Sequence, residues 1–191
     1  MSARFTLTPT AIAGVTLVER HPVGDARGSL TRLFAQDTFA ALGFPAGPVE
    51  INHTHTATKG TVRGLHLQRP PALEAKLVLC LSGAIFDVAV DLRAGSPTYG
   101  RWTHAELSAA NHCALLIPPG CAHGFQTLTE DTALLYLHSA PYTPSAEDGV
   151  HHASPDLAVR WPLPVALTSE RDAALPPFGP AFRPVKTDPA P

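Results

Sequence analysis

Apolar and polar residues alternate through much of the middle of the chain, and this period of two is typical of β-strands. The alternation and the flanking turn residues predict strands at 16–19, 49–54, 62–68, 76–82, 85–91, 102–107, 113–117 and 132–139. Gly- and Pro-containing turns separate them, clearest at 81–83, 94–97 and 118–120. One short helix is expected from Asp37 to Leu42, with Asp37 as its N-cap and Gly43 ending it.

Several of the predicted strands are apolar on both faces, for example the segment LVLCL at 77–81. Strands of a sandwich or small barrel have this pattern when a second sheet or a partner subunit covers their outer face. A length of 191 residues fits one domain, and no repeat or long linker divides the chain. We therefore expect a single, mainly β domain over 1–180 with a few short helices, followed by a loose Pro-rich tail over 181–191.

Composition and charge narrow the class of protein. Hydrophobic residues make up 45% and charged residues 16%, while Gly (14) and Pro (20) are abundant, as in strand-and-turn proteins. The formal charge of −2 gives no general attraction for nucleic acid or an anionic membrane. The N-terminus has no signal-peptide pattern, and no apolar run is long enough to span a bilayer. Three cysteines without CxxC spacing favour reduced thiols, so we expect a cytoplasmic protein with neither nucleic-acid nor membrane partners.

The densest group of candidate functional residues is the segment TVRGLHLQ at 61–68. On a strand, Gly64, His66 and Gln68 share one face, and the two leucines between them share the other. If the leucines face the core, His66 and Gln68 face a cavity. Arg63 has the parity of the leucines, so it reaches the same cavity only if the strand kinks or bulges at Gly64. A single histidine at such a position is more often a structural polar residue, so its neighbours decide its role.

Two further patterns resemble the motifs of the cupin superfamily, whose fold is a double-stranded β-helix or jelly roll. One is the PxGxxH pattern at 118–123, which ends in His123, and the other is the turn at Gly83 before the strand at 85–91. The resemblance implies a jelly-roll fold for this chain.

Metal-binding cupins carry an HxH pattern and a later Glu, but here Gln68 occupies the place of the second imidazole. Glu74 and His123 remain as potential ligands, and they complete a set only if Glu74 is suitably placed. His53 and His55 form an HxH pattern on the preceding segment, where they are equally well explained as polar residues at a strand end. We therefore expect no catalytic metal, and a metal-dependent oxygenase or isomerase is kept as an alternative.

Many short runs along the chain, in order and spacing, resemble the dTDP-4-dehydrorhamnose 3,5-epimerase family. They include DARG at 25–28, NH at 52–53, VRGLHLQ at 62–68, KLV at 76–78, FDVAVD at 86–91, GSPTYG at 95–100, AHGF at 122–125, LY at 135–136 and SERD at 169–172. The resemblance extends from about Gly14 to Pro176, which is nearly the whole chain.

This resemblance implies inversion of carbons next to the 4-keto group of a nucleotide-linked sugar, through an enolate and without metal or redox cofactor. Such a reaction needs a base on one face of the sugar, an acid on the other and a positive charge near the enolate oxygen. By resemblance, His66 is the base and Asp172 the carboxylate that orients it. Tyr136 is the acid, and Lys76 is the cation near the enolate oxygen.

The same resemblance predicts residues that bind the nucleotide sugar. They are Arg27, Asn52, Arg63, Gln68, His123 and Tyr142. Arginine suits the diphosphate because its planar guanidinium forms paired hydrogen bonds with phosphate oxygens. His138 has the strand parity of Tyr136, so it can enter the cavity and alter which carbon is reprotonated.

Two points stay open from the sequence. The enzyme can act at C3, at C5 or at both, and a sugar-nucleotide-binding protein without catalytic activity is a further alternative. An NAD-dependent epimerase is disfavoured because no strand–GxGxxG–helix unit is present. By family resemblance we expect a homodimer in which the N-terminal strand reaches the sheet of the neighbouring subunit.

Overall fold

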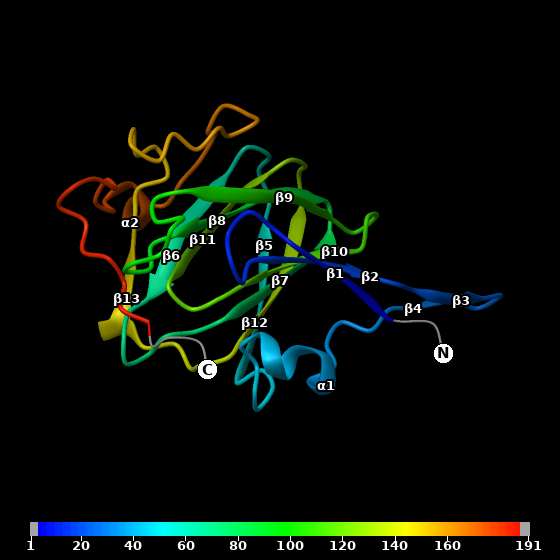
Figure 1. The fold of residues 1–191 in the computed structure, drawn as a ribbon. Coiled ribbons are helices and arrows are strands. Elements are labelled where there is room, and N and C mark those ends of the chain that lie inside the picture. The colour runs from blue at the N-terminus through cyan, green and yellow to red at the C-terminus, as the bar shows by residue number, and fades with distance from the viewer. Residues whose placement is uncertain (1–3, 188–191) are drawn as a thin grey trace.

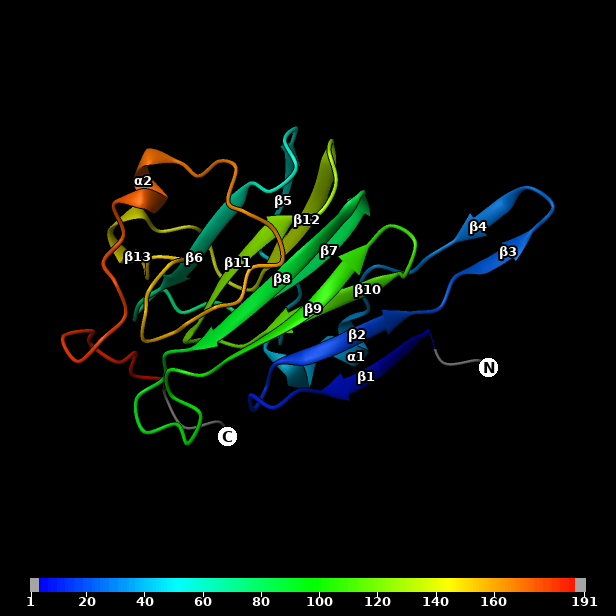
Figure 2. The same cartoon turned by 90° about the horizontal axis from the view of Figure 1, so that it is seen from above.

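A computed structural model describes residues 4–187, which form two antiparallel β-sheets packed face to face (Figures 1 and 2). The six-stranded sheet contains, in spatial order, β1 (Phe5–Pro9), β2 (Thr16–Arg20), β10 (Cys113–Ile117), β7 (Lys76–Ser82), β12 (Thr132–His138) and β5 (Glu50–Thr56). The five-stranded sheet contains β13 (Glu147–Gly149), β6 (Val62–Gln68), β11 (Cys121–Thr127), β8 (Ala84–Asp91) and β9 (Trp102–Ser108). This arrangement confirms the predicted jelly roll.

The remaining elements are short and lie around the sheets. They are the hairpin β3 (Val23–Asp25) and β4 (Gly28–Leu30), the helices α1 (Gln36–Phe39) and α2 (Glu170–Ala173), and the 3₁₀ turns η1 (Ala40–Leu42) and η2 (Pro144–Ala146). The β3–β4 hairpin projects away from both sheets, while α2 lies at the opposite end of the molecule, beside β6 and β13 (Figure 2). None of the helices between residues 4 and 187 has the length and apolar character needed to cross a membrane.

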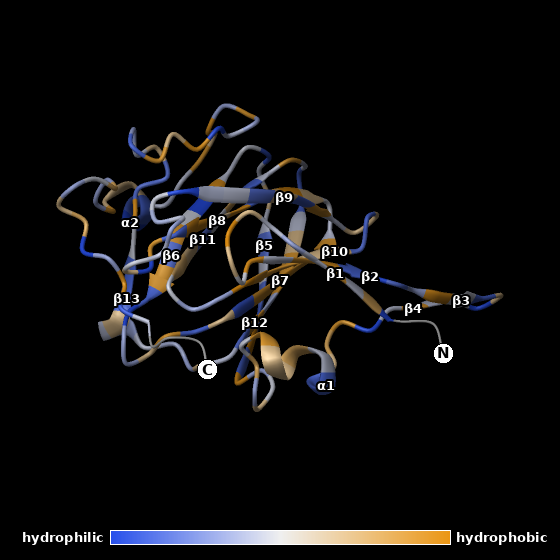
Figure 3. Cartoon of the chain, in the orientation of Figure 1, coloured by the Kyte–Doolittle hydropathy of each residue, from blue (hydrophilic) through white to orange (hydrophobic). Residues whose placement is uncertain are grey.

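Strand β7 shows why both faces of some strands are apolar. Val78 and Cys80 point into the core between the sheets, where they pack with residues of both sheets. Leu77 and Leu79 point the other way and pack against Phe39 and other residues of the α1–η1 region. The sequence predicted that something covers the outer face of this strand, and the α1–η1 region of the same chain covers it. In Figure 3 the apolar colour follows β7 and the turn after α1, whereas the start of α1 and the whole of α2 are polar.

All eight predicted strands are present, but β1, β3, β4, β11, β13 and α2 were not predicted, and the predicted helix begins elsewhere. Strands β6, β7 and β10 have the predicted bounds, whereas the buried residues of β11 neither alternate nor form a continuous apolar run. The helix begins at Gln36 after Ala35, and no side chain caps it, so the assignment of Asp37 as the N-cap was wrong. Gly43 follows η1 in a left-handed conformation (φ 100°), as the predicted end of the helix required.

The segment after 180 differs from the loose tail that we expected. Val185 is fully buried, and its N–H donates to the carbonyl of Leu92 at 2.7 Å. It also forms a parallel bridge with Arg93. The buried side chain and the paired backbone of Val185 hold this segment against the five-stranded sheet. The part of the predicted tail over 188–191 lies outside the described residues.

The three cysteines are free, as predicted. Burial raises the pKa of the Cys80 thiol to about 11 and that of the Cys121 thiol to about 12. Both thiols are therefore protonated at neutral pH, which makes them poor nucleophiles and poor metal ligands.

Candidate functional site

One cavity of about 730 Å³ lies between the two sheets, and its size suits a small-molecule ligand. Nine of the ten predicted site residues line it, and Arg27 is the exception. Those nine are Asn52, Arg63, His66, Gln68, Lys76, His123, Tyr136, Tyr142 and Asp172. The residues come from both sheets, from the loop after β12 and from α2, so the fold assembles one site from distant parts of the sequence.

An irregularity in β6 explains how Arg63 and His66 reach the same cavity. The partner strand β11 pairs His123 with His66 and Phe125 with Arg63, so β6 contains one more residue than β11 over this stretch. Gly64 lies within it, with a φ of 120° that side-chain-bearing residues rarely adopt. The bulge that the sequence required at Gly64 is therefore present, and it turns the Arg63 side chain towards the cavity.

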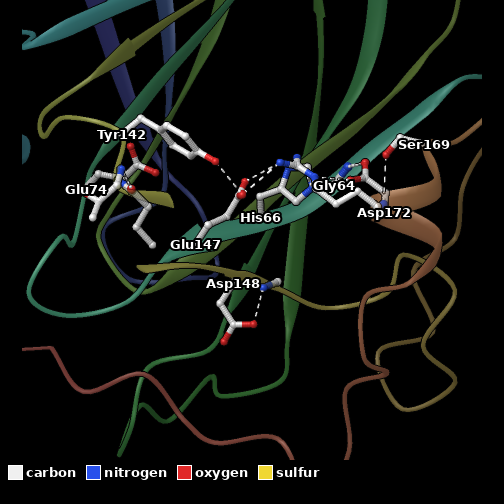
Figure 4. A network of polar contacts seen from close by, with 12 residues as sticks. Gly64, His66, Glu74, Tyr142, Glu147, Asp148, Ser169 and Asp172 are labelled. Carbon is white, nitrogen blue, oxygen red and sulfur yellow. Dashed lines mark hydrogen bonds and ion pairs between the residues drawn. The ribbon is translucent and has the colours of Figure 1, made fainter. Parts of the chain in front are cut away.

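His66 and Asp172 form a histidine–carboxylate pair at the wall of the cavity (Figure 4). Asp172 Oδ1 lies 2.8 Å from His66 Nε2, and Asp172 Oδ2 accepts the N–H of Gly64 at 2.9 Å. The N–H of Asp172 donates to Ser169 Oγ, which caps α2 and fixes the carboxylate on its first turn. Burial alone would raise the pKa of Asp172, but the hydrogen bonds from His66 and Gly64 outweigh it and hold this pKa far below its usual range.

Tyr136 enters the same cavity from β12, in the opposite sheet. Its side chain is buried, and burial raises the pKa of its phenol well above the ordinary value of 10. The phenol is therefore protonated throughout the neutral range and can act as a proton donor. The ring of His123 lies edge-on to it with centroids 5.9 Å apart, and His123 Nε2 lies 2.7 Å from the fully buried carboxylate of Asp87.

Lys76 lines the cavity from β7, the strand next to β12. Its Nζ is 3.2 Å from Glu74 Oε1 and donates to the carbonyl of His66 at 3.4 Å. The second oxygen of Glu74 lies 2.8 Å from His138 Nδ1. Burial alone would raise the pKa of Glu74, but the hydrogen bond to His138 and the charge of Lys76 lower it, so Glu74 is ionised.

Gln68 occupies the place of the second histidine in the HxH pattern of metal-binding cupins, and here it holds a neighbouring loop in the cavity wall. Its Oε1 accepts the N–H of Thr143 at 2.6 Å, and its Nε2 donates to the carbonyl of Pro141 at 3.3 Å. These bonds hold the loop that carries Tyr142. Because Glu74 is likewise engaged with Lys76, the residues that could have joined His66 as metal ligands have other partners. Among residues 4–187 no three His, Cys, Asp or Glu side chains are grouped as a metal site.

The rim of the cavity contains a pair of charged residues that sequence reasoning did not single out. Arg171 Nη1 lies 2.9 Å from Glu147 Oε1, and the hydroxyl of Tyr142 donates to Glu147 Oε2 at 2.8 Å (Figure 4). Arg171 is part of the SERD run that supplied Asp172, so its neighbourhood was indicated. No sequence signal identifies Glu147, because it joins the site only through the pairing of β13 with β6.

Arg27 lies outside the cavity, contrary to the predicted set of substrate-binding residues. It is at the tip of the β3–β4 hairpin, and 89% of its side chain is exposed. Its guanidinium forms paired hydrogen bonds with the carboxylate of Asp25 within the same hairpin. Because the hairpin projects away from the body, Arg27 cannot contact a ligand in the cavity of its own chain (Figure 2).

Comparison with known proteins places the chain in one family. The model of the family described as dTDP-4-dehydrorhamnose 3,5-epimerase matches residues 9–179. The dTDP-4-dehydrorhamnose 3,5-epimerase of Sinorhizobium fredii is 42% identical over 87% of this chain and 86% of its own length. The dTDP-4-dehydrorhamnose 3-epimerase of Streptomyces niveus is 40% identical over 87% of this chain and 80% of its own.

A solved structure agrees in fold as well as in sequence. The crystal structure of dTDP-4-dehydrorhamnose 3,5-epimerase from Bacillus anthracis, with TDP and PPi bound, superposes with a TM-score of 0.86 and 37% identity. The match covers 91% of this chain and 99% of that one. The chain therefore belongs to the dTDP-4-dehydrorhamnose 3,5-epimerase family and is an epimerase.

Proposed function

We propose that this cavity binds a dTDP-linked 4-keto-6-deoxy sugar and inverts C3, C5 or both by removing and returning a proton. The observation that carries this proposal is the placement of His66 and Tyr136 on opposite sheets of one cavity, which Lys76 also lines. A proton can then leave one face of the sugar and another can arrive at the opposite face, which is what inversion requires. The names of the matching relatives support the substrate class.

His66 is the base in this proposal. An ionised carboxylate only accepts hydrogen bonds, so the 2.8 Å contact with Asp172, which is shorter than the 3.3 Å contact of the same nitrogen with Arg171 Nη2, assigns the ring proton to His66 Nε2. The lone pair then lies on Nδ1, for which the described residues provide no hydrogen-bond partner. Nδ1 takes the proton from the carbon beside the ketone, and the electron pair of the broken C–H bond moves into the enolate. The imidazolium that forms is stabilised by the charge of Asp172.

Lys76 and Tyr136 complete the reaction. The ammonium of Lys76 neutralises the negative charge that collects on the 4-oxygen of the enolate. The enolate carbon then takes the proton of the Tyr136 phenol from the opposite face, which reforms the ketone and leaves a phenolate. Because burial raises the pKa of this phenol, the phenolate regains a proton readily, and loss of the imidazolium proton to water returns the site to its starting state.

Isotope exchange tests this function and separates it from the alternatives. The protein is incubated in D2O with dTDP-4-keto-6-deoxyglucose, with and without a chelator, and C3 and C5 are followed by NMR. Deuterium at both carbons identifies a double epimerase, and deuterium at one identifies a mono-epimerase. Exchange that stops with chelator and returns with a divalent metal supports the metal-dependent alternative. Binding without exchange supports a sugar-nucleotide-binding protein, and either result overturns the proposal.

We further propose that the active form is a homodimer in which Arg27 enters the cavity of the partner subunit. The resemblance places Arg27 among the residues that hold the diphosphate or line the sugar pocket, yet in its own chain the hairpin holds it away from the cavity. Val23 and Leu30 on the same hairpin are 49% and 70% exposed, which leaves apolar surface that a second copy can cover.

Mixed dimers test this arrangement. Arg27→Ala and His66→Asn are expected to be inactive when each is expressed alone. In a co-expressed mixed dimer, one cavity combines an intact His66 with the Arg27 of the other chain, so activity returns. If Arg27 acts within its own chain, co-expression restores nothing, and if Arg27 has no role, Arg27→Ala is active when expressed alone. A monomer by light scattering also contradicts the proposal.

A further inference from the structure

The cavity contains a further histidine–carboxylate pair, formed by His138 and Glu74, that the proposed reaction does not use. His138 lies on β12, two residues after Tyr136 and on the same face of the strand, with ring centroids 6.2 Å apart. Its Nδ1 lies 2.8 Å from Glu74 Oε2. Both side chains line the cavity, with 16% of the His138 side chain and 7% of the Glu74 side chain exposed. The pair is thus built into the cavity wall rather than placed on the surface.

The partners of Glu74 determine which nitrogen of His138 carries the proton. Glu74 is held by Lys76 at one oxygen and by His138 at the other, and a carboxylate in this setting is ionised and only accepts hydrogen bonds. In the neutral imidazole the proton must then lie on Nδ1, between the ring and the carboxylate. Nε2 is left as an acceptor, and no residue in the described part of the chain donates to it.

The position of His138 makes a sugar hydroxyl the natural donor. A pyranose whose reacting carbon lies between His66 and Tyr136 extends along β12, where the next side chain on the cavity face is that of His138. Diphosphate oxygens cannot donate a hydrogen bond to Nε2, because they are ionised acceptors. The proposed sugar has hydroxyl groups only on C2 and C3, so the donor is one of these two.

We propose that His138, oriented by Glu74, is a substrate-contacting residue that accepts a hydrogen bond from the C2 or C3 hydroxyl of the sugar. This inference rests on the proposed function, since it takes the sugar to be the ligand beside Tyr136. Glu74 acts as a positioning residue, because it fixes the His138 ring and the Lys76 ammonium with the same carboxylate. The pair thereby links recognition of a hydroxyl to the cation beside the neighbouring keto oxygen.

His138→Asn gives a sharp test, because the asparagine amide can still donate to Glu74 while the acceptor at Nε2 is removed. Affinities are measured by calorimetry for dTDP and for dTDP-6-deoxyglucose, which is unreactive because it has no keto group. We expect the variant to bind dTDP as the wild type does and dTDP-6-deoxyglucose about three- to tenfold more weakly. His53→Asn is the matched control, since His53 is exposed on β5 and does not line the cavity.

Deoxy analogues identify the hydroxyl. If the contact exists, the loss caused by His138→Asn disappears with either the 2-deoxy or the 3-deoxy form of the same ligand. An equal loss with all three sugars, or no loss with any, overturns the proposal. If His138→Asn also weakens dTDP, His138→Gln, whose amide reaches further into the cavity, is measured in the same way. A wild-type protein that binds neither dTDP nor the sugar nucleotide contradicts the proposed function itself.

Discussion

Asp172 contacts the peptide N–H of Gly64 at 2.9 Å with the carboxylate oxygen that does not contact His66. One side chain from α2 therefore fixes both the imidazole ring and the bulged backbone that presents it. The geometry of the proposed base depends on this backbone as much as on the carboxylate. It follows that a change in β6 with no ionisable group involved can still disable the site.

Gly64→Ala tests this dependence. An added Cβ would lie 2.6 Å from the Cα of Gly124 and 2.7 Å from the carbonyl oxygen of His123, and a φ of 120° is strained for alanine. We expect a loss of more than about 1 kcal/mol in the free energy of unfolding, together with a large fall in deuterium exchange. Gly95→Ala is the matched control, because its φ is also positive (75°) but nothing lies within 4 Å of the added Cβ. Equal stability of the two variants would contradict the account of the bulge.

His66→Asn should abolish exchange of the substrate C–H protons with solvent. Removing a general base typically costs about 10²- to 10⁴-fold in rate, and asparagine can keep a hydrogen bond without accepting a proton at neutral pH. The measurement is deuterium incorporation by NMR, with the affinity for dTDP as the control for an intact cavity. Inversion that persists at the wild-type rate would remove His66 from the role of base.

Tyr136→Phe should separate the two halves of the reaction. The base on the other sheet can still remove a proton and return a deuteron to the same face, so exchange continues without inversion. Loss of one buried hydroxyl leaves the ring packing in place, and the melting temperature serves as the control. The stereochemistry of the deuterated sugar, read from NMR coupling constants, gives the result. Unchanged inversion would assign the acid to another group.

Asp91 predicts a specific pH dependence of stability. Burial alone would raise its pKa, but hydrogen bonds from Arg93, Ser96 and Thr98 lower it to about 2. A lowered folded-state pKa stabilises the fold fully above the unfolded-state value of about 3.9, and this stabilisation is lost as pH falls towards 2. On acidification, the free energy of unfolding of Asp91→Asn should therefore fall by about 2 kcal/mol less than that of the wild type.

Urea unfolding at pH 7 and between pH 4 and 2 measures this difference. At pH 7 the wild type should be more stable than Asp91→Asn, and the two should converge towards pH 2. Parallel pH profiles of the two proteins would show that Asp91 is not the group responsible. Activity at neutral pH serves as a control, because Asp91 does not line the cavity.

Local sequence patterns predicted much of this fold, because alternation of apolar and polar residues shows which face of a strand packs against the core. The parity of His66 and Gln68 against their neighbouring leucines predicted that both face a cavity, and both line it. The β11 strand was missed because its buried residues include His123 and Gln126, so it shows neither alternation nor the continuous apolar run that predicted β7.

The unpredicted parts of the site depend on contacts between distant segments. Glu147 reaches the rim because β13 pairs with β6, and nothing near Glu147 in the sequence specifies that pairing. The placement of Val185 against Leu92 has the same origin. Arg27 lies in a run that predicted a substrate-binding role, but no local pattern predicted that its hairpin would project away from the cavity of its own chain.

The proposed base and acid belong to different sheets, so the packed core between the sheets acts as a spacer that sets their separation. Val78, Ile85 and Phe125 belong to this core. Close-packed interiors transmit changes in volume, so adding or removing a methyl group here would alter how far the sugar lies from Tyr136 relative to His66. The balance between exchange and inversion would then shift with no change to any polar residue. In this fold, stereochemical fidelity is a property of hydrophobic packing as well as of the reacting groups.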